Sequence, residues 1–331
     1  MQPVTLVVHA DWGSSPRKRW MARATGQAGV YRAHAPEPVG EPATLLRRLQ
    51  VQAGPGGCIL LGFDFPIGLP VRYAERAGIS DFLALLPYLG QGAWRDFYSP
   101  AERADQVNGR RPFYPLRARR KGQARILHLL AGLGLETVDS LRRRCEVARA
   151  GRRAAAPLFW TVGSQQVGKA AISGWRDVLG PALHSVDMDV AIWPFAGPLF
   201  DLFRPGRVVI AETYPAEFYT HLGVRFARRP GQRSGKRVQE ARAANAPALL
   251  AWAGAARIRL APELRAELRA GFGSSADGDD RFDAAVGLFG MLNVVLGRRP
   301  PGDPTDDVVR KVEGWILGQL MTQSGVQPSG C

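Results

Sequence analysis

The chain has 331 residues, of which 46% are hydrophobic, so it can bury a sizeable core and is neither a disordered tail nor a fibre. Its 44 Lys and Arg residues against 29 Asp and Glu give a formal net charge of +15. Such a charge attracts polyanions, although the abundance of Arg could also reflect the base composition of a genome.

Two short apolar strands are predicted in the first 70 residues, and each ends in an aspartate. One apolar run leads into Asp11 and stops at Trp-Gly-Ser-Ser-Pro, and a second leads into Asp64 and is stopped by prolines and glycines. Between them, residues 18–25 and 30–35 suggest the two strands of a hairpin. Residues 41–52 suggest a helix, because leucines recur there at helical spacing.

At about residue 71 the sequence changes to a helical, Arg-rich pattern, which predicts an insertion. Aromatic residues are interleaved with its arginines, an arrangement that can stack on bases but is more often part of a core. Strand character returns at 186–193 and, more strongly, at 207–212, where the strand ends in Glu212. Helices are expected at 236–254, 261–271, 281–296 and about 308–320. The predicted organisation is a core of residues 1–70 and 186–297, a basic helical insertion of residues 71–185, and a C-terminal helix and tail of residues 298–331.

Two windows of the sequence hold the excess positive charge. Residues 110–153 carry 13 basic and three acidic residues, a net charge of +10, and residues 225–242 carry seven basic and one acidic residue, a net charge of +6. The rest of the chain is close to neutral. We interpret the two windows as a surface that faces a polyanion, and the alternative is an ordinary solvated face of helices.

Cysteine usage and apolar runs indicate the cellular context. Cys58, Cys145 and Cys331 are far apart and odd in number, which favours neither a disulfide framework nor a zinc knuckle. No uncharged apolar run approaches the ~20 residues that a spanning helix needs, and the first residues lack the pattern of a signal peptide. We therefore expect a cytoplasmic protein with no membrane segment.

Five acidic residues are expected at the ends of strands or near the start of a helix: Asp11, Asp64, Glu212, Asp280 and Asp283. A partly buried carboxylate is costly unless it is paired or binds a metal. Clustered carboxylate oxygens suit Mg²⁺ or Mn²⁺, and two such ions about 4 Å apart can activate water for phosphodiester cleavage. Each acid taken alone could instead be a turn or helix-capping residue.

Several motifs resemble those of a bacterial and archaeal family of unknown function, whose members are labelled predicted RNase H-like nucleases related to the RuvC resolvases. The matching segments extend from residue 11 to about residue 297, and their order fits that fold. They are Asp11-Trp12-Gly13, Phe63-Asp64-Phe65-Pro66-Ile67-Gly68-Leu69-Pro70, Glu212-Thr213-Tyr214-Pro215, Lys236 with Arg242, and Asp279-Asp280-Arg281-Phe282-Asp283-Ala284-Ala285.

The resemblance implies an α/β fold with an RNase H-like mixed five-stranded sheet flanked by helices, in which the first and fourth strands lie side by side. It implies that Asp11 and Asp64 are the central metal ligands. Asp280 and Asp283 would match the paired carboxylates that RuvC-like proteins carry on their last helix.

Two features depart from the related resolvases. These enzymes have no acid at the position of Glu212, so this residue is either a further ligand or the ion-pair partner of Lys236 and Arg242. About 115 residues separate the fourth and fifth strands, and this large, mainly helical insertion contains the +10 window. It would either grip the substrate or act as a lid that restricts the site to something small.

Two phosphate-binding motifs are near matches. Residues 11–15 also resemble the first phosphate loop of actin-like ATPases and sugar kinases, but the second, Asp-Gly-rich loop of those proteins is not found in the sequence. Residues 158–170 nearly form a P-loop, but Ala170 stands where Ser or Thr would bind Mg²⁺. An anion-binding loop from which Lys169 reaches a phosphate fits better. His9 is either a core residue or a neighbour that supports Asp11.

Together these patterns predict a metal-dependent phosphodiester hydrolase, a nuclease that acts on RNA or DNA with Mg²⁺ or Mn²⁺. The predicted catalytic residues are Asp11, Asp64, Glu212, Asp280 and Asp283, and all of them except Glu212 are predicted metal ligands. The predicted substrate-binding residues are Lys169, Lys236 and Arg242. The alternatives are a non-catalytic module that binds nucleic acid or a protein, and a phosphate-binding enzyme related to actin and the sugar kinases.

Overall fold

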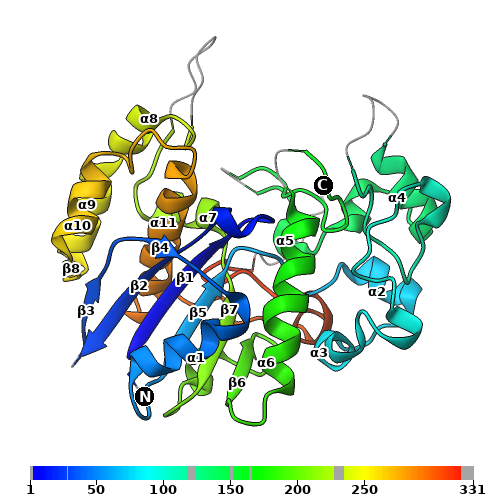
Figure 1. Ribbon diagram of the computed structural model, residues 1–331, viewed down its shortest axis with the longest axis horizontal. Coiled ribbons are helices and arrows are strands. Elements are labelled where there is room, and N and C mark those ends of the chain that lie inside the picture. The colour runs from blue at the N-terminus through cyan, green and yellow to red at the C-terminus, as the bar shows by residue number, and fades with distance from the viewer. Residues whose placement is uncertain are drawn as a thin grey trace, which may run out of the picture.

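The computed structural model describes residues 3–27, 29–117, 124–149, 152–163, 166–226 and 235–321. These residues form an α/β fold in which a mixed eight-stranded sheet is flanked by helices (Figure 1). The strand order is β6-β7-β5-β1-β2-β3-β8, and β4 pairs with β2. The α/β class agrees with the prediction. The described sheet has eight strands instead of five: strands form in both predicted segments, 186–193 and 207–212, and two further short strands, Glu37–Pro38 and Arg259–Leu260, also pair with the sheet.

The sheet combines an antiparallel ribbon with a parallel half. The ribbon consists of β1 (Leu6–Trp12), β2 (Arg19–Gln27) and β3 (Val30–Ala33). The parallel half adds β5 (Ile59–Phe63), β7 (Val208–Glu212) and β6 (Val190–Trp193) beside β1. The short strands are β4 (Glu37–Pro38) and β8 (Arg259–Leu260). The pairing of β1 with β5 places the first and fourth predicted strands side by side, as expected.

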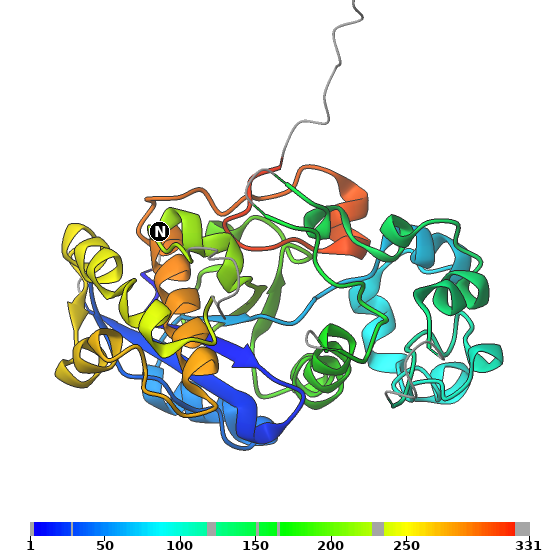
Figure 2. The same ribbon diagram turned by 90° about the horizontal axis from the view of Figure 1, so that it is seen from above.

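Alternation along the strands divides the side chains of the sheet between two faces. One face packs on α11 (Gly278–Val295), which crosses β1 and β2. The opposite face is covered by α1 (Pro42–Ala53) and by the continuous helical stretch of α5 (Val167–Gly174) and α6 (Gly180–His184), as Figures 1 and 2 show. The face that a strand residue occupies therefore decides which of the two cores it enters.

The contact between α11 and β1 depends on a glycine. His9 is fully buried, and its ring lies against Gly287, where a Cβ atom would come within 2.3 Å of three ring atoms. Burial lowers the pKa of His9 to about 3, so the ring is neutral. Neither ring nitrogen has a hydrogen-bond partner among the described residues. Of the two roles expected for His9, the structure supports that of a core residue.

The insertion between β5 and β6 shares its interior with the core on the α1 face of the sheet. Its helices are α2 (Val71–Ala77), α3 (Phe82–Leu85), α4 (Ile126–Leu133), α5 and α6. Phe97, Phe113, Phe159 and Trp175 are fully buried and form edge-to-face and stacked pairs. These aromatic side chains belong to the core and form no exposed surface for base stacking.

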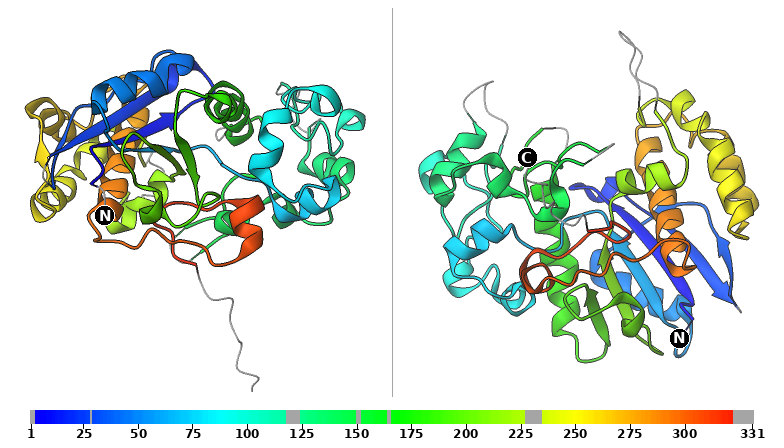
Figure 3. Two further views of the ribbon diagram at one scale, coloured as in Figure 1. Left: turned by 90° about the horizontal axis from the view of Figure 1, so that it is seen from below. Right: turned by 180° about the vertical axis from the view of Figure 1, so that it is seen from behind.

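The remaining helices and the C-terminal segment complete the fold. α7 (Pro215–His221) follows β7. α9 (Ala246–Ala255) and α10 (Pro262–Arg269) lie beside β3 and β8, and α8 (Gln239–Ala243) contacts α10 and α11 (Figure 1). Residues 298–321 return across the ends of the strands to contact α2 and α3 (Figure 3). Short 3-10 turns are found at Pro16–Lys18, Leu86–Tyr88, Gly92–Trp94, Ala104–Gln106, Val138–Leu141, Arg144–Glu146 and Leu199–Leu202, and π turns at Trp175–Leu179 and Val309–Glu313. In the described part of the chain, no helix is long and apolar enough to cross a membrane.

The packing of Gly287 on His9 gives a stability prediction. Gly287→Ala should lower the free energy of unfolding by about 3 kcal/mol, because the new methyl group overpacks a rigid ring. The matched control is Gly254→Ala on α9, where no atom lies within 4 Å of the new Cβ and stability should rise by up to about 1 kcal/mol. Urea denaturation measures both variants, and equal effects would contradict the described contact.

Candidate functional site

The carboxyl groups of Asp11 and Asp64 lie close together at the ends of two parallel strands. Asp11 is near the end of β1, Asp64 directly follows β5, and the register pairs Ala10 with Phe63. The backbone N–H of Trp12 donates to Oδ1 of Asp64 at 2.6 Å. The two carboxyl groups are within hydrogen-bonding reach of each other. Both carboxyl groups lie on the face of the sheet that α11 covers. The chain neighbours of Asp11 and of Asp64 point the other way, into the core on the α1 face.

Asp283, in the second turn of α11, is the third carboxylate of the cluster. It is 3% exposed, and the hydroxyl of Tyr219 donates to its Oδ1 at 2.6 Å. The ammonium group of Lys236 forms an ion pair with its Oδ2. We call Asp11, Asp64 and Asp283 the carboxylate cluster. The sequence-based prediction placed these three acids and Lys236 in one site, and the structure brings them together.

The charges within the carboxylate cluster are unbalanced. Burial, followed by repulsion from Asp64 and Asp283, raises the pKa of Asp11 well above its usual range. Burial also raises the pKa of Asp64, although the hydrogen bond from Trp12 partly offsets this effect. Burial alone would lower the pKa of Lys236, but the neighbouring carboxylates raise it, so the ammonium remains charged. Three carboxyl groups share this one ammonium, and a proton or a further cation can balance the excess negative charge.

Asp280 lies at the edge of the carboxylate cluster. Burial, and then repulsion from Asp279, raises its pKa to about 6, while the positive charges of Lys18 and Lys236 act in the opposite direction. Its Oδ2 atom is buried and has no hydrogen-bond partner among the described residues. Asp280 and Asp283 therefore both border the site, as their spacing on one helix predicted, but Asp280 is the more exposed of the two.

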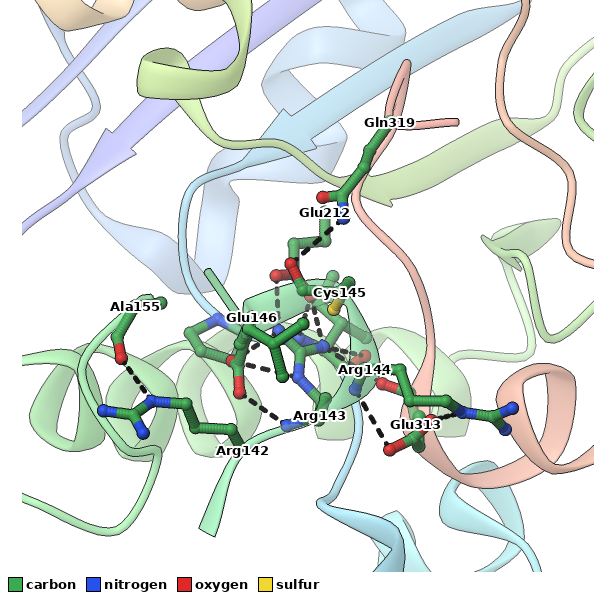
Figure 4. A network of polar contacts seen from close by, with 12 residues as sticks. Arg142, Arg143, Arg144, Cys145, Glu146, Ala155, Glu212, Glu313 and Gln319 are labelled. Atoms are coloured by element: carbon green, nitrogen blue, oxygen red, sulfur yellow. Dashed lines mark hydrogen bonds and ion pairs between the residues drawn. The ribbon is translucent and has the colours of Figure 1, made fainter. Parts of the chain in front are cut away.

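Glu212 lies on the opposite face of the sheet from the carboxylate cluster. The register of β5 and β7 pairs Phe63 with Glu212, and both side chains alternate away from α11. Both carboxylate oxygens accept hydrogen bonds from Arg143 at 2.6 Å, and one also accepts from the N–H of Ile67 at 2.7 Å (Figure 4). Lys236 and Arg242, the partners expected for Glu212, bind elsewhere. The side chain of Glu212 therefore has a local structural partner instead of a place in the carboxylate cluster.

Arg143 joins four segments of the chain. It is fully buried, and besides Glu212 it binds Glu146 at 2.8 Å and the carbonyl oxygens of Ile67 and Glu313 at 3.1 Å (Figure 4). These contacts connect the insertion, the loop after β5, the end of β7 and the C-terminal segment. A buried ion pair of this kind is strongly destabilising when one partner is removed, because the other charge remains buried.

The charge windows of the sequence overstate the positive surface. Arg143, Arg144 and Arg152 form ion pairs with carboxylates outside the 110–153 window, namely Glu212, Asp306, Glu313 and Glu217. In the second window, Lys236 pairs with Asp283. Residues 118–123, 150–151 and 227–234 of the two windows lie outside the described residues. Arg143 and Arg152, which were counted as surface charge in the sequence, are thus largely buried ion-pair partners, whereas Arg144 is paired but partly exposed.

Two other predicted substrate-binding residues have different surroundings. Arg242 is buried and donates to the carbonyl oxygens of Lys236, Gly271 and Gly273 at 2.6–2.8 Å, so it holds the segment that carries Lys236. Lys169 lies in the first turn of α5. Its backbone N–H donates to Gln166, but its side chain has no hydrogen bond or ion pair among the described residues.

Helix α5 approaches the end of β1. Ser173 accepts a hydrogen bond from the Trp12 indole at 3.0 Å, and the hydroxyl of Ser14 donates to Gln166 at 3.1 Å. The residues before α5 form no strand of the sheet, since Trp160 makes only an isolated bridge, so the strand of a P-loop is not present there. Residues 164–165 of that near match lie outside the described residues.

Sequence reasoning missed three residues beside the carboxylate cluster. Tyr219 contacts Asp283, and Tyr214 lies close enough to Asp64 and Asp283 for their charges to help raise its pKa after burial. Thr213 directly follows β7, and alternation along the chain puts it on the same side as Ala211. Its buried hydroxyl has no hydrogen-bond partner among the described residues. Because side chains alternate between the two faces of a sheet, the residue that follows Ala211 on the α11 face is Thr213 and not Glu212. The contact of Tyr219 has no comparable sequence signal, because it depends on the packing of α7 against α11.

The carboxylate cluster contains oxygen donors of the kind that Mg²⁺ and Mn²⁺ prefer. In the arrangement described, however, no group of three or more His, Cys, Asp or Glu side chains is placed to hold a metal ion. One reason is that Lys236 and Tyr219 already contact both oxygens of Asp283. Neither Asp11 nor Asp64 is contacted by a cationic side chain or a hydroxyl group of the described residues.

Comparison of the chain with protein-family models, with curated proteins and with solved structures finds no match. An interpretation of the carboxylate cluster therefore relies on its geometry and charge. The features that matter are the adjacent strand ends, the raised pKa values and the single ammonium group.

The position of Glu212 predicts a structural phenotype for its substitution. Glu212→Gln should lower the free energy of unfolding by about 3 kcal/mol, because Arg143 loses half of its buried charge partners. The exposed pair of Arg204 and Asp189 provides the control, since Arg204→Gln should change stability by less than about 1 kcal/mol. Chemical denaturation at neutral pH measures the two variants. A Glu212→Gln variant as stable as the wild type would show that this ion pair does not hold the segments together.

Proposed function

We propose that this protein is a metal-dependent phosphodiester hydrolase of RNase H-like fold, a nuclease of the cytoplasm that acts on RNA or DNA. Support for the fold comes from the strand order, in which the antiparallel ribbon β3-β2-β1 is followed by the parallel strands β5 and β7, with α11 packed across β1 and β2. Support for a reducing compartment comes from Cys58 and Cys145, which are both buried and free.

The observation that carries the proposed activity is the pair of carboxyl groups at the ends of β1 and β5. Asp11 and Asp64 are held side by side in a buried position where two negative charges repel each other. A divalent cation would relieve that repulsion, and carboxylate oxygens are its preferred ligands. Asp11 and Asp64 would hold it, with Asp283 and Asp280 completing the site. When bound, Mg²⁺ or Mn²⁺ would supply activation of water and stabilisation of the leaving oxygen.

The other residues of the site would orient these ligands and attract substrate. The N–H of Trp12 fixes the carboxylate of Asp64, and the hydroxyl of Tyr219 fixes that of Asp283. Lys236 provides positive charge beside the carboxylates, where it would neutralise a phosphate group of the substrate. Lys169, in the first turn of α5, would add to that charge.

A specific observation favours a second candidate, a non-catalytic module that binds nucleic acid or a protein. Lys236 already neutralises Asp283, and a proton shared by Asp11 and Asp64 would satisfy those two carboxyl groups. The carboxylate cluster is thus able to be stable without a metal ion. The two candidates differ in whether Mg²⁺ or Mn²⁺ binds through Asp11.

Asp11→Asn separates the two candidates. It should reduce metal-dependent cleavage of labelled RNA or DNA by at least about 10³-fold, equivalent to about 4 kcal/mol of transition-state stabilisation. Without metal, the melting temperature of the variant should rise by about 2–4 °C, because relief of carboxylate repulsion is worth about 1 kcal/mol. Mn²⁺ should raise the melting temperature of the wild type and leave that of the variant unchanged.

The matched control is Asp189→Asn, which removes an aspartate before β6, at the other end of the strands, where it pairs with Arg204 and Arg207. This variant should retain both cleavage and the response to Mn²⁺. If the wild type neither cleaves nucleic acid nor responds to Mn²⁺ or Mg²⁺, the hydrolase proposal is wrong and the binding module is favoured.

A further inference from the structure

A second polar cluster lies beside α7 and is dominated by positive charge. Glu217 on α7 forms ion pairs with Arg152 at 3.4 Å and with Arg299 at 3.8 Å. Arg149 lies near enough to Arg152 that repulsion, after burial, lowers its pKa. We call Arg149, Arg152 and Arg299 the arginine cluster. In the described part of the chain, Glu217 is the one carboxylate that forms ion pairs with these three guanidinium groups, so the cluster keeps an excess of two positive charges.

Several guanidinium nitrogens of the arginine cluster lack partners. Nε of Arg149 and Nη1 of Arg152 are buried and have no hydrogen-bond partner among the described residues. Nε of Arg152 is also buried, and its approach to Glu217 lacks hydrogen-bond geometry. The side chain of Arg152 is only 9% exposed. A buried donor without an acceptor is costly, and more so when it is charged, so these nitrogens are suited to an anionic ligand.

Tyr214 connects the arginine cluster with the carboxylate cluster. The guanidinium carbon of Arg152 lies 5.4 Å from the centre of the Tyr214 ring. The phenol hydroxyl has no hydrogen bond to any described residue, and its pKa, raised mainly by burial, also responds to Arg152 and Lys236 and to Asp64 and Asp283. Helix α7 provides a second connection, because Glu217 contacts the arginines and Tyr219 contacts Asp283.

We propose that the arginine cluster and Tyr214 form a binding site for a phosphate group of a nucleic acid, next to the phosphate on which the carboxylate cluster acts. Guanidinium groups bind phosphate oxygens through charge-assisted, often bidentate hydrogen bonds, and the free phenol adds a donor. The excess of two positive charges matches the charge of such a group. The proposal takes the class of substrate from the proposed function, but the site itself binds phosphate without any reaction.

Arg152→Gln tests this site in the Asp11→Asn background, where cleavage is prevented. The probes are inorganic phosphate, followed by calorimetry, and a labelled single-stranded oligonucleotide of mixed sequence, followed by fluorescence anisotropy. We expect Arg152→Gln to abolish phosphate binding and to weaken oligonucleotide binding by about tenfold. The slope of log affinity against log salt concentration should fall in magnitude by about one. Arg204→Gln, with the same change of charge at the other end of the strands, should alter none of these values.

Each outcome of this experiment decides the proposal. Equal binding by Arg152→Gln and Arg204→Gln would overturn it, and so would loss of phosphate binding with unchanged oligonucleotide affinity. Arg299→Gln replaces Arg152→Gln if the latter unfolds, and the same criteria apply. Because binding is measured without turnover, an inactive wild type that still binds phosphate through Arg152 would contradict the hydrolase and leave the phosphate site in place.

Discussion

Two carboxyl groups held side by side at the ends of β1 and β5 impose the strongest constraint on this molecule. Asp11 is 6% exposed, and after burial the largest electrostatic effects on its pKa come from two further carboxylates, Asp64 and Asp283. Buried like charges are tolerated only where a proton, an ammonium group or a metal ion compensates for them. The hydrogen bonds from Trp12 and Tyr219 and the ion pair with Lys236 are all arranged around this requirement.

A second buried ionic group, on the opposite face of the sheet, has a structural role. Arg143 brings the insertion, β7 and the C-terminal segment together around the carboxylate of Glu212. Its contact with the carbonyl of Ile67 also fixes the loop that leaves β5 just beyond Asp64. The insertion is thereby anchored to the strand ends at which the carboxylate cluster lies. This explains how so long a segment between β5 and β6 can contribute Arg152 to a neighbouring site.

The strand ends could be predicted from the sequence, whereas the faces and the partners of their acids were predicted only in part. Asp11 and Asp64 follow apolar runs whose lengths and ends can be recognised in the sequence. Glu212 ends a similar run, but it pairs with Phe63, whose side chain points away from α11. The side chain of Glu212 therefore enters the core on the opposite face of the sheet. Arg143 was counted as surface charge because its partner lies 69 residues away. No local pattern encodes such tertiary pairing.

The most direct test of the account is a crystal structure of the wild type grown with Mn²⁺, with anomalous scattering to locate the ion. We expect an anomalous peak between Asp11 and Asp64, about 2.0–2.2 Å from an oxygen of each, as is usual for a hard divalent cation. An absence of any peak there, with Lys236 still paired to Asp283 and the two carboxyl groups still within hydrogen-bonding reach of each other, would contradict the proposed metal site.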